Sequence, residues 1–225
     1  MVITLANQKG GVGKSTVTML LANWLTTRKH SVLVLDVDAQ STITNQRTRD
    51  RENFNSQEFF YEVIPYDIKQ PIEDIVQVLT ELSQANQETF IIVDAPGNLS
   101  DNGLIPFLTL ADVIICPFQY EMKSLDSTGT FMLVLQQLLE KYSKGTTQIY
   151  LPNRVKLGAG TKAEKEEFAK IEDVFKRYGL VAPILRELQC LARTNSISLN
   201  KEQEQAVSDC FNWIYTEICE TKKSI

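Results

Sequence analysis

The segment Lys9-Gly-Gly-Val-Gly-Lys-Ser-Thr16 decides the fold of this chain, together with what stands on each side of it. Before it, residues 2–6 read Val-Ile-Thr-Leu-Ala, a short apolar run that predicts a β-strand. After it, apolar side chains recur at helical spacing, at Val17, Leu20, Leu21, Trp24 and Leu25. The sequence therefore predicts a strand, a glycine-rich turn and a helix in direct succession.

This succession carries a variant of the P-loop pattern, G-x-x-x-x-G-K-[ST]. Gln8 takes the place of the first glycine, and Lys9 adds a lysine ahead of the usual one, Lys14. Glycines let backbone N–H groups turn inward, and a helix N-terminus attracts anions, so the loop can hold a polyphosphate. The residues predicted to bind the nucleotide phosphates are Gly10, Gly11, Val12, Gly13, Lys14, Ser15 and Thr16.

The side chains of Lys14 and Ser15 have specific roles in P-loops. The charge of Lys14 reaches the β- and γ-phosphates, and the hydroxyl of Ser15 can be a ligand of magnesium. The alternative is a glycine-rich turn with two incidental lysines. The strand before the turn and the amphipathic helix after it disfavour that alternative, because they supply the structural context that the pattern requires.

Three aspartates at strand ends are candidates for the same site. Asp94 closes the apolar run 90–94, where its carboxylate would lie beside the loop and hold magnesium directly or through water. The alternative for Asp94 is a helix cap or a turn residue. Asp36 and Asp38 alternate at the end of another run, so only one of them needs to point at the site. We assign Asp36 to the metal and Asp38 to the attacking water, against a capping or surface role for Asp38.

The rest of the chain alternates between strand and helix patterns. Apolar β-branched runs at 31–36, 89–94, 112–117 and 148–151 predict parallel strands covered on both faces. Helical patterns lie between and after them, at 72–82, 122–142 and 168–178. This alternation predicts an α/β fold, a doubly wound and mostly parallel sheet flanked by helices on both faces. The length of 225 residues suits a single domain, 1–225.

Composition excludes several classes of protein. Hydrophobic residues make up 43% and charged residues 23%, which is ordinary for a globular chain. No apolar run approaches the roughly 20 residues that span a bilayer, and the first residues lack the basic region of a signal peptide, so we expect a cytoplasmic protein. The four cysteines include no C-x-x-C pair, and His30 is the only histidine, so a zinc cluster is disfavoured.

Charge is unevenly distributed along the chain. The formal net charge of -5 argues against a strongly basic nucleic-acid binder. Residues 61–140 hold 2 basic and 12 acidic side chains, so a DNA-facing surface would draw on the C-terminal third. The last helical stripe, from Lys201, carries acidic residues opposite its apolar face. Anionic lipid would repel those residues, so the stripe is expected to dock on the core and not on a membrane.

Three segments together resemble a known family. Lys9–Thr16, Leu35-Asp-Val-Asp-Ala-Gln40 and Ile92-Val-Asp-Ala-Pro-Gly97 are similar to the deviant Walker A, switch I and switch II motifs of the ParA/MinD ATPases. The resemblance implies an Mg²⁺-dependent ATPase that forms an ATP-bound sandwich homodimer, in which Lys9 reaches across to the partner's phosphates. It also implies slow hydrolysis that a partner stimulates, and it places Asn153 and Arg154 where relatives contact the adenine.

The chain departs from the partition group of this family at two points. Ala39 stands where a proline is usual, and no helix-turn-helix extension precedes the first strand, so the chain resembles the short form. Relatives in that group bind DNA nonspecifically through basic residues near the C-terminal edge of the dimer. The candidates here, with solvated surface charges as the alternative, are Arg186, Arg193, Lys201, Lys222 and Lys223.

The resemblance leads to two functional hypotheses. The first is a bacterial partition ATPase, nucleoid-associated, that responds to a ParB-like DNA-bound adaptor. The second is a positioning or assembly switch that acts through protein partners without DNA, such as a MinD-like cell-division regulator or a component of a conjugative or secretion system. The net charge of -5 keeps the second hypothesis open.

Overall fold

The computed structural model describes residues 1–54, 56–85, 88–97, 101–142, 145–156, 158 and 161–224, without the side chains of 220–224. Within these residues seven strands form one sheet in the order β3-β2-β4-β1-β5-β6-β7, and every neighbouring pair is parallel. The strands are β1 (Val2–Leu5), β2 (Val32–Asp36), β3 (Glu62–Pro65), β4 (Phe90–Asp94), β5 (Val113–Phe118), β6 (Thr147–Pro152) and β7 (Leu180–Val181).

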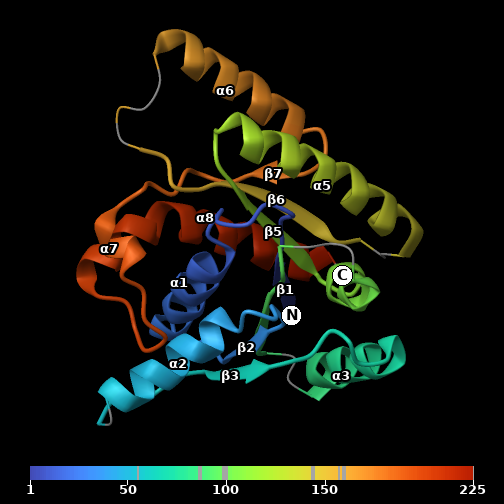
Figure 1. The fold of residues 1–225 in the computed structure, drawn as a ribbon, viewed down its shortest axis with the longest axis vertical. Helices are drawn as coiled ribbons and strands as arrows, with labels where there is room; N and C mark the ends of the chain where they lie inside the picture. Colours follow the sequence, from blue (N-terminus) through green and yellow to red (C-terminus); the bar gives the residue numbers. More distant parts are fainter. Residues whose placement is uncertain are drawn as a thin grey trace.

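Helices cover both faces of this sheet (Figure 1). One face carries α1 (Lys14–Thr27), α2 (Thr42–Asn53), α7 (Gln189–Ala192) and α8 (Lys201–Ser224). The other carries α3 (Ile72–Ala85), α4 (Ile105–Thr109), α5 (Met122–Tyr142) and α6 (Lys162–Phe175). The predicted α/β fold, a doubly wound parallel sheet of the P-loop type, is confirmed.

The central strands bring the predicted site together. β1 lies between β4 and β5, and all residues of these three strands are buried. The register pairs Leu5 with Asp94 and Asp36 with Asp94, so the ends of β1, β2 and β4 lie at one edge of the sheet. In open parallel sheets, ligands bind beyond the carboxyl ends of the strands, where the connections diverge to opposite faces.

The predicted C-terminal stripe docks on the core. Val207, Phe211 and Ile214 of α8 are fully buried, and the ring of Phe211 meets that of Trp24 edge-on at 5.9 Å. The apolar residues of α8 thus pack against α1 and belong to the same buried cluster, which explains why this stripe is apolar. None of the helices in the described part of the chain combines the length and the apolarity that crossing a bilayer requires.

Five strands and α-helices escaped the sequence analysis, namely β3, β7, α2, α4 and α7. The helices α4 and α7 have only five and four residues, which is too short for a helical period. β3 is an edge strand whose residues are mostly exposed, and β7 has only two residues. α2 buries only Ile43, Arg47 and Asp50, and therefore has no apolar stripe from which a helix could be predicted.

Candidate functional site

The backbone of the glycine-rich loop requires its glycines. Gly11 and Gly13 have φ angles of 80° and 94°, which other residues adopt only with strain. A Cβ atom on Gly13 would also lie 2.5 Å from Nδ2 of Asn153. That amide nitrogen donates to the carbonyl of Val12 at 2.8 Å. The loop is therefore held from the side by the residue that follows β6.

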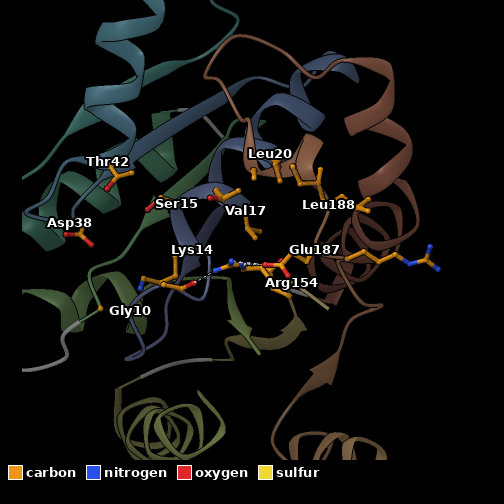
Figure 2. Close-up of a pocket in the computed structure, with 18 of the residues that line it drawn as sticks. Gly10, Lys14, Ser15, Val17, Leu20, Asp38, Thr42, Arg154, Glu187 and Leu188 are labelled. Carbon is orange, nitrogen blue, oxygen red and sulfur yellow. Dashed lines mark hydrogen bonds and ion pairs between the residues drawn. The ribbon is translucent and has the colours of Figure 1, made fainter. Parts of the chain in front are cut away.

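A hollow of about 480 Å³ opens in front of this loop (Figure 2). Its polar end is lined by the loop and the switch I segment, including Lys14, Ser15, Thr16, Asp38 and Thr42. Its other end is largely apolar and is formed by Val17, Leu20, Leu188, Leu191 and Ala192. The size, with one end polar and one apolar, suits a nucleotide whose phosphates lie on the loop and whose base lies near α7.

The side chain of Lys14 lies inside this site. It is only 7% exposed, although it carries a positive charge. Burial lowers the pKa of the Lys14 ammonium, and the charges of Asp94 and Asp38 act in the opposite direction. A buried cation that lines the hollow is suited to hold an anion there, as the sequence predicts for the nucleotide phosphates.

Asp94 provides a test of whether the site fits a metal ion. Its Oδ1 accepts a hydrogen bond from the Thr18 hydroxyl at 3.2 Å, whereas its buried Oδ2 has no hydrogen-bond partner among the described residues. Burial raises the pKa of Asp94 to about 7, with Asp36 adding to the rise and the Ser15 hydroxyl and Lys14 opposing it. A buried carboxylate with an unpaired oxygen beside a serine hydroxyl offers the oxygen ligands that Mg²⁺ prefers.

Asp36 and Asp38 occupy different positions. Oδ2 of Asp36 accepts hydrogen bonds from the backbone N–H and the hydroxyl of Thr44, at 2.8 and 2.7 Å, and Oδ1 is buried without a partner among the described residues. Asp38 lines the nucleotide hollow, and Asp36 does not. Oδ1 of Asp38 also accepts from the N–H of Gln40 at 2.9 Å. Asp38 thus lies where the predicted water-orienting role requires it, and its bond to Gln40 adds a turn contact that the sequence analysis did not consider.

Lys9 lies outside the hollow that its own loop forms. It is absent from the residues that line this hollow, and its side chain is half-buried. Its backbone N–H donates to Oδ1 of Asn7 at 3.0 Å, but among the described residues its ammonium group makes no hydrogen bond or ion pair. The charge of Lys9 therefore remains available to a group outside this chain.

Asn153 and Arg154 line the hollow beside the loop. Arg154 donates to the carbonyl of Gly11 at 3.3 Å and pairs with Glu187 at 2.8 Å. The sequence analysis did not identify Glu187 or the three α7-side residues Leu188, Leu191 and Ala192. No local pattern marks them, because they come more than 170 positions after the loop and α7 has only four residues.

The predicted DNA-contacting residues are spread over different places. Arg186 lines the nucleotide hollow, where its charge can also serve the nucleotide. Arg193 and Lys201 are exposed, just after α7 and at the start of α8. Lys222 and Lys223 belong to α8, and their side chains lie outside the described part of the structure.

Asp94 should make the stability of the nucleotide-free protein depend on pH. Its folded pKa of about 7 exceeds the ordinary value of 3.8, so between these values the folded state keeps a proton that the unfolded state releases. We expect this contribution to the free energy of unfolding to be fully present below about pH 4 and lost as the pH rises through about 7. Asp94→Asn should remove this pH dependence, which changes the free energy of unfolding by an amount on the order of a few kcal/mol. Urea unfolding of the wild type and the variant across this pH range measures it. An unchanged pH dependence in the variant would contradict this.

Comparison with known proteins places the chain in a family. The CobQ/CobB/MinD/ParA nucleotide binding domain matches residues 3–197. No curated protein matches the sequence. Among solved structures, a variant of McdA from Cyanothece in complex with ATP is 19% identical, with 99% of this chain and 96% of that chain covered and a TM-score of 0.71.

Two other solved structures have the same fold. MinD in the MinC:MinD complex of Aquifex aeolicus is 19% identical, with 96% of this chain and 95% of that chain covered and a TM-score of 0.73. A plasmid partition protein from Borrelia burgdorferi is 20% identical, with 96% of this chain and 98% of that chain covered and a TM-score of 0.67. With most of its length matched by the family's profile, the chain belongs to the CobQ/CobB/MinD/ParA family of nucleotide-binding domains.

Proposed function

We propose that this chain is an Mg²⁺-dependent ATPase that switches between a monomer and an ATP-bound sandwich homodimer, and that the dimer acts in DNA partition. The observation that carries the proposal is the position of Lys9. It belongs to the phosphate loop but lies outside the hollow of its own chain, with no ionic partner among the described residues. A second subunit facing the loop would bring a phosphate to this unused charge.

The site residues have distinct roles in this proposal. The loop N–H groups and Lys14 hold the phosphates, and Ser15, Asp94 and Asp36 hold Mg²⁺ directly or through its water shell. When bound, the ion neutralises charge on the phosphates. Asp38 orients the attacking water, and Asn153 and Arg154 hold the base side together with the apolar wall near α7.

Lys9→Ala should separate nucleotide binding from dimerisation. Because Lys9 does not line its own hollow, the variant should bind ATP with an affinity within about twofold of the wild type. It should lose the dimer, since the charge across the interface is missing. Light scattering during size exclusion, with and without Mg²⁺ and ATP, measures this. A Lys9→Ala protein that still dimerises with ATP would refute the role proposed for Lys9.

DNA binding is the part of the proposal that most needs a direct test. It is supported by the exposed cations Arg193 and Lys201 and by the shared fold with a plasmid partition protein. We expect a duplex of arbitrary sequence to bind only with Mg²⁺ and ATP, and binding to weaken steeply with salt, because phosphate contacts release counterions. Fluorescence anisotropy of labelled DNA, with ADP and Lys9→Ala as controls, tests this. Absence of binding at low salt with ATP rejects DNA partition.

The second candidate is a switch that acts through protein partners without DNA. The net charge of -5 favours it, and MinD, which shares the fold, was solved in complex with the protein MinC. It predicts an ATP-dependent dimer that fails to bind DNA at low salt. The same light-scattering and anisotropy measurements therefore distinguish the two candidates. In both, the sandwich dimer is the active form.

A further inference from the structure

A buried carboxylate joins α2 to the loop between α7 and α8. Asp50 of α2 is 3% exposed, and its Oδ2 accepts hydrogen bonds from the backbone N–H and the hydroxyl of Ser196, at 2.6 and 2.8 Å. Its Oδ1 accepts from Nε2 of Gln46, one turn earlier in α2, at 2.8 Å. The two oxygens therefore differ: one bonds within the helix, and the other bonds to a segment 146 residues later in the chain.

α2 depends on such polar contacts for its position. Most helices are held by an apolar stripe, but the buried residues of α2 are Ile43, Arg47 and Asp50. Arg47 donates to the carbonyl of Tyr61 at 2.8 Å and so fixes α2 to the start of β3. Asp50 fixes the same helix to the α7–α8 loop. Hydrogen bonds are directional, so these two contacts, together with the bonds from Thr44 to Asp36, help to orient α2.

The two segments that Asp50 joins lie at opposite ends of the nucleotide hollow. α2 begins directly after switch I, and Asp38 and Thr42 line the polar end. The loop follows α7, which contributes Leu191 and Ala192 to the apolar end. Figure 2 shows these two ends on opposite sides of Lys14 and Ser15, with Asp38 and Thr42 on one side and Leu188 on the other.

The same loop is also fixed to the helix that follows the phosphate loop. Nδ2 of Asn23 in α1 donates to the carbonyl of Asn195 at 2.8 Å. The side chain of Asn195 caps its own turn by accepting from the N–H groups of Ile197 and Ser198. Residues 195–196 are thus a junction between α1 and α2, and the exposed cations Arg193 and Lys201 stand on either side of it.

We infer that Asp50 is a positioning residue that couples switch I to the loop 193–200, so that nucleotide bound at the phosphates also orders this loop, which begins with Arg193 and leads into Lys201 of α8. Breaking the bonds to Ser196 would leave one oxygen of a buried carboxylate and two donors of Ser196 without these partners, which is costly. Movement of α2 with the nucleotide state should therefore move the loop with it. The inference rests on the proposed ATP switch. It adds a route by which nucleotide binding changes the segment proposed to contact DNA.

The experiment is hydrogen–deuterium exchange with and without Mg²⁺ and the nonhydrolysable analogue AMPPNP. In the wild type, the amides of 193–200 should exchange more slowly when the nucleotide is saturating. In Asp50→Ala, that nucleotide-dependent protection should fall by about tenfold, a typical coupling between linked sites. Gln46→Ala is the matched control, because it removes the partner of the other carboxylate oxygen and leaves the bonds to Ser196 intact. It should retain the wild-type response.

A merely structural role for Asp50 would lower the melting temperature but leave the nucleotide-dependent protection unchanged, and that outcome overturns the inference. A wild-type loop that does not respond to the nucleotide overturns it as well. If Asp50→Ala does not fold, Ser196→Ala is used to test the coupling, because it removes only the hydrogen bond from the Ser196 hydroxyl to Asp50. It should lower the protection by about two- to threefold, and an unchanged response again overturns the inference.

DNA binding separates this inference from the proposed function. If the wild type binds DNA with ATP, Asp50→Ala should lose most of the ATP-dependent gain in affinity while Gln46→Ala keeps it. Equal binding by Asp50→Ala refutes the coupling and leaves the partition proposal standing. Coupled exchange in a wild type that never binds DNA refutes the partition proposal and supports the coupling.

Discussion

Lys14→Ala is expected to abolish ATP binding. The Lys14 side chain is buried and lines the polar end of the hollow, where it interacts electrostatically with Asp94 and Asp38. Removing one partner of a buried charge pair costs about 2–5 kcal/mol, which corresponds to an increase in Kd of about 30-fold to several thousandfold. Isothermal titration calorimetry with Mg²⁺ and ATP measures the loss. A change in Kd of less than about threefold would show that the phosphates do not depend on Lys14.

Two further variants separate charge from other effects of this substitution. Lys14→Met keeps the aliphatic part of the side chain and removes the charge, so it should be as defective as alanine. Lys9→Ala removes the other lysine of the same loop and should still bind ATP, since Lys9 does not line the hollow. Circular dichroism establishes that each variant is folded. Binding by Lys14→Met would assign the effect to packing instead of charge.

Asp38→Ala is expected to bind ATP and to accumulate as an ATP-bound dimer that hydrolyses it very slowly. The Asp38 side chain lies at the polar end of the hollow, where it can orient a water molecule toward the terminal phosphate. Loss of such a group reduces turnover by about 10²- to 10⁴-fold. Phosphate release measures the rate, and light scattering measures the dimer. Hydrolysis at the wild-type rate would show that the water-orienting assignment is wrong.

The turn role of Asp38 can be separated from its chemical role. Asp38 accepts from the N–H of Gln40 at 2.9 Å, and Asp67 accepts from the N–H of Lys69 at the same distance, but Asp67 does not line the nucleotide hollow. Asp67→Ala therefore removes the same kind of turn contact and should leave turnover unchanged. Asp38→Asn keeps an acceptor for Gln40 and removes the negative charge. It should be as slow as Asp38→Ala, whereas recovered turnover in Asp38→Asn would favour the turn role.

Much of the fold could be predicted because its signals are local. The strands β1, β2, β4, β5 and β6 are continuous apolar runs, and their predicted positions agree with the structure to within one or two residues. β3, β7 and α2 gave no such signal, since exposed edge strands and a polar helix carry no apolar period. The helices α4 and α7 were missed for another reason, since five and four residues are too few to show a helical period.

The phosphate loop and the three aspartates were evident from the sequence because one short segment and three strand ends contain all of their chemistry. The sequence did not show which of Asp36 and Asp38 lines the hollow. Residues two apart on a strand point to the same side, but β2 ends at Asp36, so the path of the chain after the strand decides where Asp38 lies.

The sequence by itself determined a strand–loop–helix with a polyphosphate site and a second lysine, since these follow from residues at fixed, short spacing. Only the tertiary structure decided that Asn153 buttresses Val12, that α7 closes the apolar end of the hollow, and that Asp50 holds Ser196. The hydrogen bonds among these contacts join residues 141 and 146 positions apart, and α7 begins more than 170 positions after the phosphate loop. No local pattern encodes such a pair, because its members meet only when the sheet and the helices packed on it have formed.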